Sequence, residues 1–222
     1  MTFRLELYRS LKDPDTKFHQ LKIAEVVPIS LGKISFILFL SLIVSCIQAY
    51  FALSTASLSH LIADYSASEF ELAKLLIGFG GIIDAIVSPL TYLLFTSVWF
   101  WIFLDNVRFR QSFVVNTISV FIFTIGKVIL LPFEIWLGVN SVTSPFALGV
   151  VTHLFTMKEY LIYFFGHLSV FLLWSIIIQI YAFQRLATNR KVIIVLVTVS
   201  VHLIIILFAV FLQYLVNFFT LN

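Results

Sequence analysis

The sequence predicts an all-α, polytopic membrane protein, a bundle of five transmembrane helices. Hydrophobic residues make up 61% of its 222 residues and charged residues only 11%, whereas soluble domains contain about 25% charged residues. The mean hydropathy is +1.07. The apolar residues form long unbroken runs, which is typical of helices that lie in a bilayer. We therefore expect the lipid bilayer to be the main partner of the chain.

Five apolar runs are long enough to cross about 30 Å of hydrocarbon, which takes about 20 helical residues. They cover residues 34–56, 82–104, 113–137, 160–183 and 192–214. Because no loop is long enough for a separate soluble domain, residues 34–222 are predicted to form one five-helix transmembrane domain. Residues 1–33 are predicted to be an interfacial N-terminal segment on the cytoplasmic side.

The N-terminal segment contains a candidate amphipathic helix. Its apolar residues, which we expect to face lipid, are Phe3, Leu5, Tyr8 and Leu11. Asp13-Pro14 should end this helix, because proline disfavours helical backbone in the residue before it. Such a helix serves either as an anchor at the membrane surface or as a docking surface for a cytoplasmic partner.

Lysine and arginine are distributed unevenly, which predicts the orientation of the chain. The N-terminal segment holds six of them and the turns at 105–112 and 184–191 hold two and three, whereas the opposite side holds only Lys74 and Lys158. Cytoplasmic loops are rich in lysine and arginine, so the N-terminus is predicted to be cytoplasmic and the C-terminus outside. This arrangement is that of a multi-pass protein of the cell (cytoplasmic) membrane.

The basic residues of the two turns form a candidate cytoplasmic docking face together with the N-terminal helix. They are Arg108, Arg110, Arg185, Arg190 and Lys191. Because these residues flank apolar runs and do not form one continuous stripe, we expect them to contact lipid headgroups or other membrane proteins and not nucleic acid.

The residues that lead into the second span have two interpretations. The sequence Ser-Glu-Phe-Glu at 68–71 is a capping-box pattern that predicts the start of a helix. Gly78, Gly80 and Gly81 follow it and favour a hinge between an interfacial helix and the second span. One long tilted helix is the alternative. Gly78 and Gly81 would also allow close contact with a second copy, so a homo-oligomer is left open.

Three ionisable residues, Asp84, Lys127 and Glu134, lie within the second and third spans and form the candidate intramembrane polar cluster. A charge at the bilayer centre costs about 2.5–3.5 kcal/mol on insertion scales, so such residues normally pair, line a cavity or carry a function. Lys127 and Glu134 are two helical turns apart and therefore share a helix face. We favour an ion pair that joins the two spans, with a polar cavity or gate as the alternative.

Two prolines lie inside predicted spans and are expected to kink them. Pro89 lies in the second span and Pro132 in the third, and each removes one backbone hydrogen bond. His167 and His202 lie in the last two spans. We expect them to be hydrogen-bonded packing residues, with a proton relay as the alternative.

No pattern in the sequence indicates catalysis or a metal site. HExxH, GxSxG, P-loop and GxGxxG patterns are all missing, so no catalytic residue and no enzymatic activity is predicted. His60 with Asp64 and His153 with Glu159 lie in two outer loops and would supply metal ligands only if those loops met. We therefore predict neither a metal site nor a cofactor.

Four landmarks follow one another along nearly the whole chain. They are Asp13-Pro14 with Phe18, Gly80-Gly81 with Asp84 and Ser88-Pro89, Arg108-Phe109-Arg110-Gln111-Ser112-Phe113, and Leu173-Trp174-Ser175 before a basic turn. With them the chain resembles the bacterial branch of the Yip1 family of integral membrane proteins. The resemblance implies a five-span Yip1 domain without an enzymatic reaction. Some bacterial relatives accompany ABC-type exporters that protect against toxic peptides, whereas the Asp-Leu-Tyr-Gly-Pro motif of the eukaryotic trafficking factors is absent here.

The predicted function is that of a non-enzymatic accessory or scaffold protein that assembles with other membrane proteins. The resemblance points to the subunits of an ABC-type exporter, one involved in protection against toxic peptides, as the partner. A small transporter or channel that uses Asp84, Lys127 and Glu134 is the first alternative. A membrane immunity factor that binds a pore-forming peptide is the second.

Overall fold

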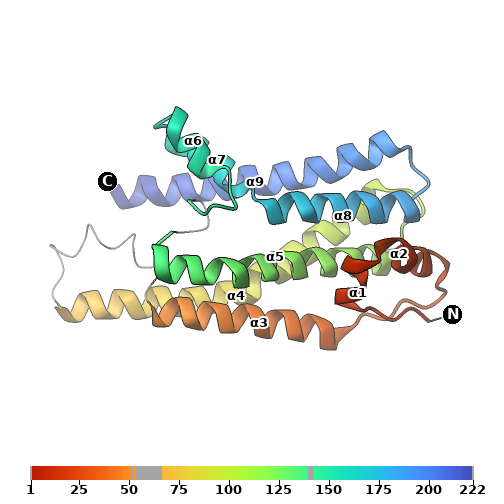
Figure 1. Cartoon of the computed structure of the whole chain (residues 1–222), viewed down its shortest axis with the longest axis horizontal. Helices are drawn as coiled ribbons and strands as arrows, with labels where there is room; N and C mark the ends of the chain where they lie inside the picture. The colour runs from red at the N-terminus through yellow and green to blue at the C-terminus, as the bar shows by residue number, and fades with distance from the viewer. Residues whose placement is uncertain (1, 52, 54–66, 140–142, 222) are drawn as a thin grey trace.

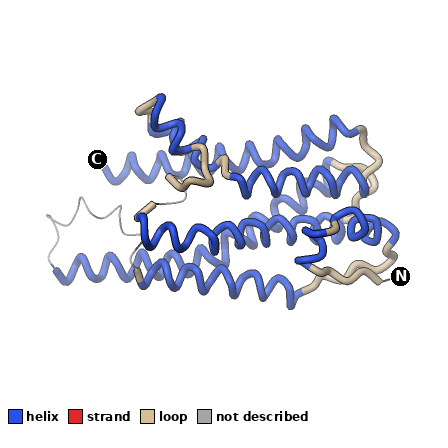
Figure 2. Tube along the Cα trace, in the orientation of Figure 1, coloured by secondary structure: helices blue, strands red, loops and turns tan. Residues whose placement is uncertain are grey.

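A computed structural model describes residues 2–51, 53, 67–139 and 143–221 of the chain. Every regular element in these residues is an α-helix (Figure 2), which confirms the all-α class. Four of the helices are long and apolar enough to cross a membrane. They are α3 (Leu31–Tyr50), α4 (Ala67–Phe103), α5 (Phe109–Leu137) and α9 (Lys191–Leu221).

Five shorter helices complete the described part of the chain. They are α1 (Leu7–Lys12), α2 (Pro14–Ile23), α6 (Gly149–Phe155), α7 (Glu159–His167) and α8 (Val170–Leu186). The apolar helix α8 has 17 residues, about 25 Å of helix, which is less than a bilayer core requires.

The long helices form an antiparallel bundle around α5 (Figure 1). Helices α3 and α4 pack against each other and against α5, and α8 packs against both α5 and α9. More than half of the α5 span is buried, against less than a third of the spans in α3, α4 and α9. The rings of Phe100 on α4 and Phe183 on α8 stack 4.2 Å apart in the core. Helix α5 is therefore the central element of the bundle.

The predicted fourth span, residues 160–183, is not one helix. Helix α7 ends at His167 and α8 begins at Val170. The Ser169 hydroxyl accepts a hydrogen bond from the Leu172 N–H (3.2 Å), and the Val170 N–H donates to the carbonyl oxygen of Phe146 (2.9 Å). The prediction of a continuous helix was wrong because this side-chain cap and a distant loop take over the backbone hydrogen bonds at the break.

Helix α4 is continuous over 37 residues, so the predicted hinge at its glycines is wrong and the long-helix alternative is confirmed. It begins at Ala67, immediately before the predicted capping-box pattern. Gly78 packs closely on α3, where a Cβ atom at this position would lie 3.4 Å from the Cβ of Ala49. A glycine costs only about 1 kcal/mol in a helix, and the packing of α3 alongside α4 offsets that cost.

The N-terminal segment packs into the protein and does not present a helix to lipid. Phe3 and Leu5 are buried in the core, and Leu11 packs partly buried against it, while Tyr8 is exposed. The Phe3 N–H donates to the carbonyl oxygen of Val26 (3.0 Å), so the first residues are extended. The prediction that the apolar residues face lipid was wrong for Phe3, Leu5 and Leu11, because these three cover the end of the bundle.

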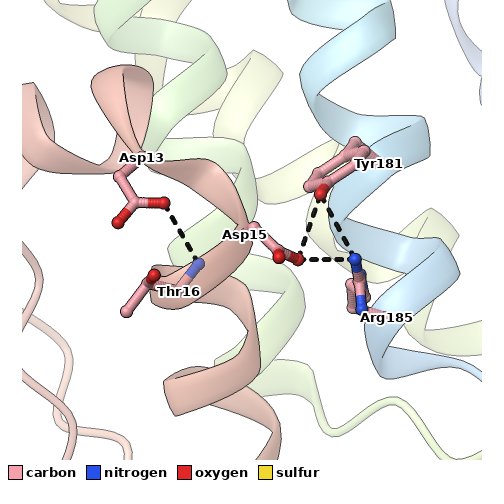
Figure 3. Close-up of polar contacts among 5 residues, drawn as sticks. All are labelled: Asp13, Asp15, Thr16, Tyr181 and Arg185. Carbon is pink, nitrogen blue, oxygen red and sulfur yellow. Dashed lines mark hydrogen bonds and ion pairs between the residues drawn. The ribbon is translucent and has the colours of Figure 1, made fainter.

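Asp13 ends α1 and begins α2, as the sequence predicted. Its carboxylate accepts a hydrogen bond from the Thr16 N–H at 3.4 Å (Figure 3). Pro14 occupies the first turn of α2, where its missing N–H is not needed. The two short helices therefore meet at a sharp corner over one end of the bundle.

The N-terminal segment and the two basic turns lie at the same end of the bundle (Figure 1). We call this end, residues 2–30, 104–110 and 185–191, the basic end. The Asp105 N–H donates to Oδ1 of Asn189 (2.7 Å), and Nδ2 of Asn189 donates back to Oδ2 of Asp105 (2.7 Å). Hydrogen bonds in both directions therefore tie the α4–α5 turn to the α8–α9 turn.

Candidate functional site

The three ionisable residues of the predicted polar cluster occupy different surroundings. Glu134 on α5 is 7% exposed, and its Oε2 accepts a hydrogen bond from Nε2 of Gln48 on α3 (2.6 Å). Lys127 is half-buried and lines a cavity, whereas Asp84 is exposed on α4. Among the described residues no ion pair joins any two of the three, although Lys127 and Glu134, two turns apart on α5, attract each other electrostatically. The structure therefore brings Glu134 to Gln48 and leaves Lys127 facing the cavity.

The cavity around Lys127 lies inside the bundle and has a volume of about 390 Å³. Helices α3, α4, α5 and α9 and the α7–α8 break all contribute to its wall. Polar groups that line it include Tyr92, Lys127, His167, Ser169 and His202. Apolar groups that line it include Pro89, Leu130, Phe171, Ile205 and Ile206. A volume of this size and a largely apolar wall with a few polar groups are typical of small-molecule sites, which measure roughly 300–1,000 Å³.

The break between α7 and α8 brings a helix N-terminus to this cavity. Ser169, which caps α8, and Leu172 in its first turn both line the cavity. The N-terminus of a helix carries a partial positive charge. In α8 the Val170 and Leu172 N–H groups are already bonded to Phe146 and Ser169, so the helix dipole, more than free donors, acts on the cavity. His167 lies on the other side of the break, and its Nε2 is buried without a hydrogen-bond partner in the described part of the chain. The break therefore adds polar, electropositive groups to an otherwise apolar wall.

Gly126 sets the distance between α5 and α8 beside the cavity. A Cβ atom at this position would lie 2.8 Å from the Cγ and Cδ2 atoms of the Phe171 ring. Only a residue without a side chain fits at this separation, because real Cβ contacts are longer. Both residues line the cavity, so this close contact shapes one of its walls.

Tyr92 and His202 join the cavity to a buried network of hydrogen bonds. Nδ1 of His202 lies 2.8 Å from the Thr198 carbonyl oxygen, which can only accept, so Nδ1 carries the proton. Nε2 then accepts from the Tyr92 hydroxyl at 3.0 Å. Nε2 of Gln179 on α8 donates both to the Tyr92 oxygen (3.3 Å) and to Oδ1 of Asn116 on α5 (2.9 Å). The network therefore links α4, α5, α8 and α9.

The network continues from Asn116 towards the basic end. Nδ2 of Asn116 lies 3.2 Å from Oγ of Ser97 and 3.3 Å from Oγ of Ser112, and that serine donates to the Ser97 carbonyl oxygen (3.0 Å). Sequence reasoning placed His202 among the packing residues but did not single out Tyr92 or Asn116. The sequence does contain a sign of this network. Polar residues follow one another on a single helix face of an apolar run, at Ser112, Asn116 and Ser119.

The five basic residues of the predicted docking face divide into two groups. Arg108 donates hydrogen bonds to the carbonyl oxygens of Ala24 (2.6 Å) and Glu25 (3.1 Å). Arg185 forms an ion pair with Asp15 (2.5 Å), and the Tyr181 hydroxyl donates to the same carboxylate oxygen (3.0 Å), as Figure 3 shows. Both arginines therefore hold the N-terminal segment on the bundle. The other three, Arg110, Arg190 and Lys191, are exposed.

The two prolines lie inside continuous helices. Pro89 is within α4 and lines the cavity, whereas Pro132 is within α5 and is exposed. Pro89 therefore has a place in the cavity wall that Pro132 does not share.

Most of the metal ligands that the sequence suggested lie outside the residues that the structure describes. His60, Asp64 and the side chain of Glu159 are outside the described residues. Within the described residues no group of three His, Cys, Asp or Glu side chains is arranged to hold a metal ion.

No protein-family model, curated protein or solved structure matches this chain. The resemblance to the Yip1 family therefore stays a prediction, and the site has to be interpreted from its own chemistry.

Proposed function

We propose that this multi-pass protein holds a small ligand in the cavity around Lys127, as a small transporter or a membrane-embedded binding protein does. One observation carries the proposal: an intramembrane lysine lines a cavity of ligand size and has no ion-pair partner among the described residues. Because a charge at membrane depth is costly, and Glu134 attracts Lys127 only from a distance, the lysine needs a closer group to compensate it. A bound ligand supplies that group.

The proposed topology keeps five crossings, with α7 and α8 together forming a broken fourth crossing. Helices that are interrupted near the membrane midplane are common where transporters bind substrates, because the free helix ends supply polar groups. The proposed orientation has the basic end in the cytoplasm, following the distribution of lysine and arginine. The protein would then belong to the cytoplasmic membrane, and its cavity would lie in the outer half of the bundle.

Filling the cavity tests this proposal. Ala209 on α9 lines the cavity, so Ala209→Phe should occupy it, whereas Leu207→Phe on the same helix replaces an exposed side chain and is the matched control. Both variants and the unmodified protein are purified in mild detergent, and the small molecules that co-purify are extracted and identified by mass spectrometry. We expect at least one compound to be retained by the unmodified protein and by Leu207→Phe but lost from Ala209→Phe. Identical extracts from all three proteins would contradict the proposal.

An accessory or scaffold role remains the second candidate, and the position of Asp84 favours it. Asp84 is exposed within the apolar span of α4. It lies about 9 Å along the helix axis from Gly78, the residue of α4 that packs against Ala49 near the end of α3. An exposed carboxylate at that depth would be compensated by a cation of a partner membrane protein. The resemblance to the Yip1 family makes a subunit of an ABC-type exporter the expected partner.

A photo-crosslinking residue at position 84 tests the second candidate. It should join the chain to one defined membrane protein in native membranes, and the same residue at the exposed position 102 on α4 should not. Crosslinks to lipid alone from both positions would count against a scaffold role that involves Asp84.

A further inference from the structure

The charged side chain in the cavity wall is basic. Lys127 lines the cavity, and no aspartate or glutamate is among its lining residues. Glu134, two turns further along α5, is held by Gln48 on α3 and attracts Lys127 from outside the lining residues. His202 is hydrogen-bonded through both ring nitrogens and adds no negative charge to the wall. The wall itself is therefore electropositive.

Two further groups line the same cavity from the α7–α8 break. Ser169 and Leu172 bring the N-terminus of α8, a helix of 17 residues, to the cavity wall. Its dipole favours an anion at that place. His167 lines the same cavity with a buried Nε2 that has no partner among the described residues and could donate a hydrogen bond. Lysine, helix end and imidazole thus all suit a negatively charged oxygen.

The remainder of the wall suits an apolar body. Pro89, Leu130, Ile205 and Ile206 line the cavity from α4, α5 and α9. A purely ionic ligand would leave these side chains in contact with water, whereas an alkyl or aromatic body would cover them. The volume of about 390 Å³ lies near the lower end of the range for small-molecule sites, which favours a single-chain amphiphile over a two-chain lipid.

We infer that the ligand of this cavity is a single-chain amphiphile with one anionic group, a carboxylate or a phosphate. Its charged end lies between Lys127 and the N-terminus of α8, and its apolar body lies against Pro89, Leu130, Ile205 and Ile206. The inference rests on the proposed function and adds the chemical class of the ligand to it.

Binding of matched probes to the protein in detergent tests this inference. The probes are a fluorescent fatty acid, its uncharged methyl ester and an alkyl phosphate of the same chain length. We expect the acid or the phosphate to bind at least about tenfold more tightly than the ester, as expected for a hydrogen bond to a charged group. Whichever anion binds more tightly identifies the headgroup. Because this comparison uses the unmodified protein, it does not depend on the folding of a variant.

Substitutions then assign the charge preference to Lys127. Lys127→Met should bind acid and ester equally, and Lys127→Arg should retain a preference for the acid because it keeps the charge. Lys191→Met, which removes an exposed lysine at the basic end, is the control and should bind like the unmodified protein. An unchanged preference for the acid in Lys127→Met would overturn the inference.

The outcomes separate the ligand class from the proposed function. Equal binding of acid and ester to the unmodified protein, lost in Ala209→Phe, would overturn the inference about charge and leave a ligand-binding cavity. Failure of all three probes, while Ala209→Phe still loses a co-purifying compound, would overturn the amphiphile class alone. Failure of the probes and identical extracts from Ala209→Phe would overturn both proposals.

Discussion

The hydroxyl of Tyr92 on α4 donates a hydrogen bond to Nε2 of His202 on α9, at a distance of 3.0 Å. The two residues line the cavity on one side and connect through Gln179 to Asn116 on the other. Buried polar groups in an apolar protein stabilise it only when their partners are present, because an unmade hydrogen bond cannot be replaced by water. This hydrogen bond therefore holds α4 against α9 beside the cavity that both residues line.

Tyr92→Phe should lower the stability of the protein modestly. It removes the donor to His202 and the acceptor for Gln179, and hydrogen bonds between membrane helices contribute on average about 0.6 kcal/mol and at most about 1.7 kcal/mol. Thermal unfolding in detergent measures the effect. Tyr214→Phe, at an exposed position on α9, is the control and should unfold like the unmodified protein. Equal melting temperatures for the two variants would mean that the network does not stabilise the bundle.

Gly126→Ala should be strongly destabilising for a change of one methyl group. The added Cβ would lie 2.8 Å from the Phe171 ring, so α5 and α8 would have to separate, at a cost of about 1–3 kcal/mol. Gly81→Ala is the matched control, because no atom lies within 4 Å of a Cβ added there, and alanine favours a helix by about 1 kcal/mol.

Thermal unfolding of these two glycine variants should therefore shift in opposite directions. Gly126→Ala should cost less stability in a Phe171→Ala background than in the unmodified protein, since the ring no longer obstructs the new methyl group. If Gly126→Ala melts like Gly81→Ala, then this glycine does not set the spacing of α5 and α8.

Lys127→Met should leave the stability unchanged or raise it. The lysine has no ion-pair partner among the described residues, so the variant removes a poorly compensated charge and adds an apolar side chain of similar length. Gln48→Leu should instead lower stability by about 1–3 kcal/mol, because it leaves the buried Glu134 carboxyl without its donor. Thermal unfolding distinguishes the two. A loss in Lys127→Met as large as that in Gln48→Leu would restore the idea of a structural ion pair.

Acidification should loosen α1 through Glu6. The hydrogen bond from Lys17, assisted by the charge of Arg9, holds the pKa of the Glu6 carboxyl below its usual 4.5. Because the folded state has the lower pKa, the stabilisation is present above the unfolded pKa and is lost as the pH falls through the folded pKa. Docking of residues 7–12 should therefore weaken only below about pH 4.5.

Hydrogen–deuterium exchange, corrected for the intrinsic effect of pH, measures this loosening. Glu6→Gln should remove the pH dependence at α1, while Arg4→Gln, which changes an exposed residue, should keep it. Exchange at α1 that rises equally with acid in unmodified protein and in Glu6→Gln would assign the effect to another group.

Hydropathy predicted the position of those helices in which one continuous apolar run is flanked by polar residues. The predicted spans 113–137 and 192–214 lie within α5 and α9. The α7–α8 break was missed because its cause is not local: Ser169 caps α8 only where residues 146 and 147 pair with the chain beside it. The glycines of α4 were misinterpreted for a related reason, since the packing of α3 against Gly78 depends on the tertiary structure and cannot be inferred from the local sequence.

The candidate site could be predicted only in part. A lysine in an apolar run indicates a polar site at membrane depth, and Lys127 does line the cavity. Its surroundings could not be foreseen, because they come from six separate parts of the chain that meet only in the folded bundle. Asn116 was similarly hidden, since one amide in an apolar run changes the average hydropathy little although it is buried and hydrogen-bonded.

The paired hydrogen bonds between Asp105 and Asn189 join the α4–α5 turn to the α8–α9 turn at the basic end. Arg108 likewise joins the start of α5 to the carbonyl oxygens of Ala24 and Glu25 in the N-terminal segment. A relative movement of the helices at this end would break several of these hydrogen bonds at once. In the proposed transporter, passage across the bilayer would therefore require these bonds to open first.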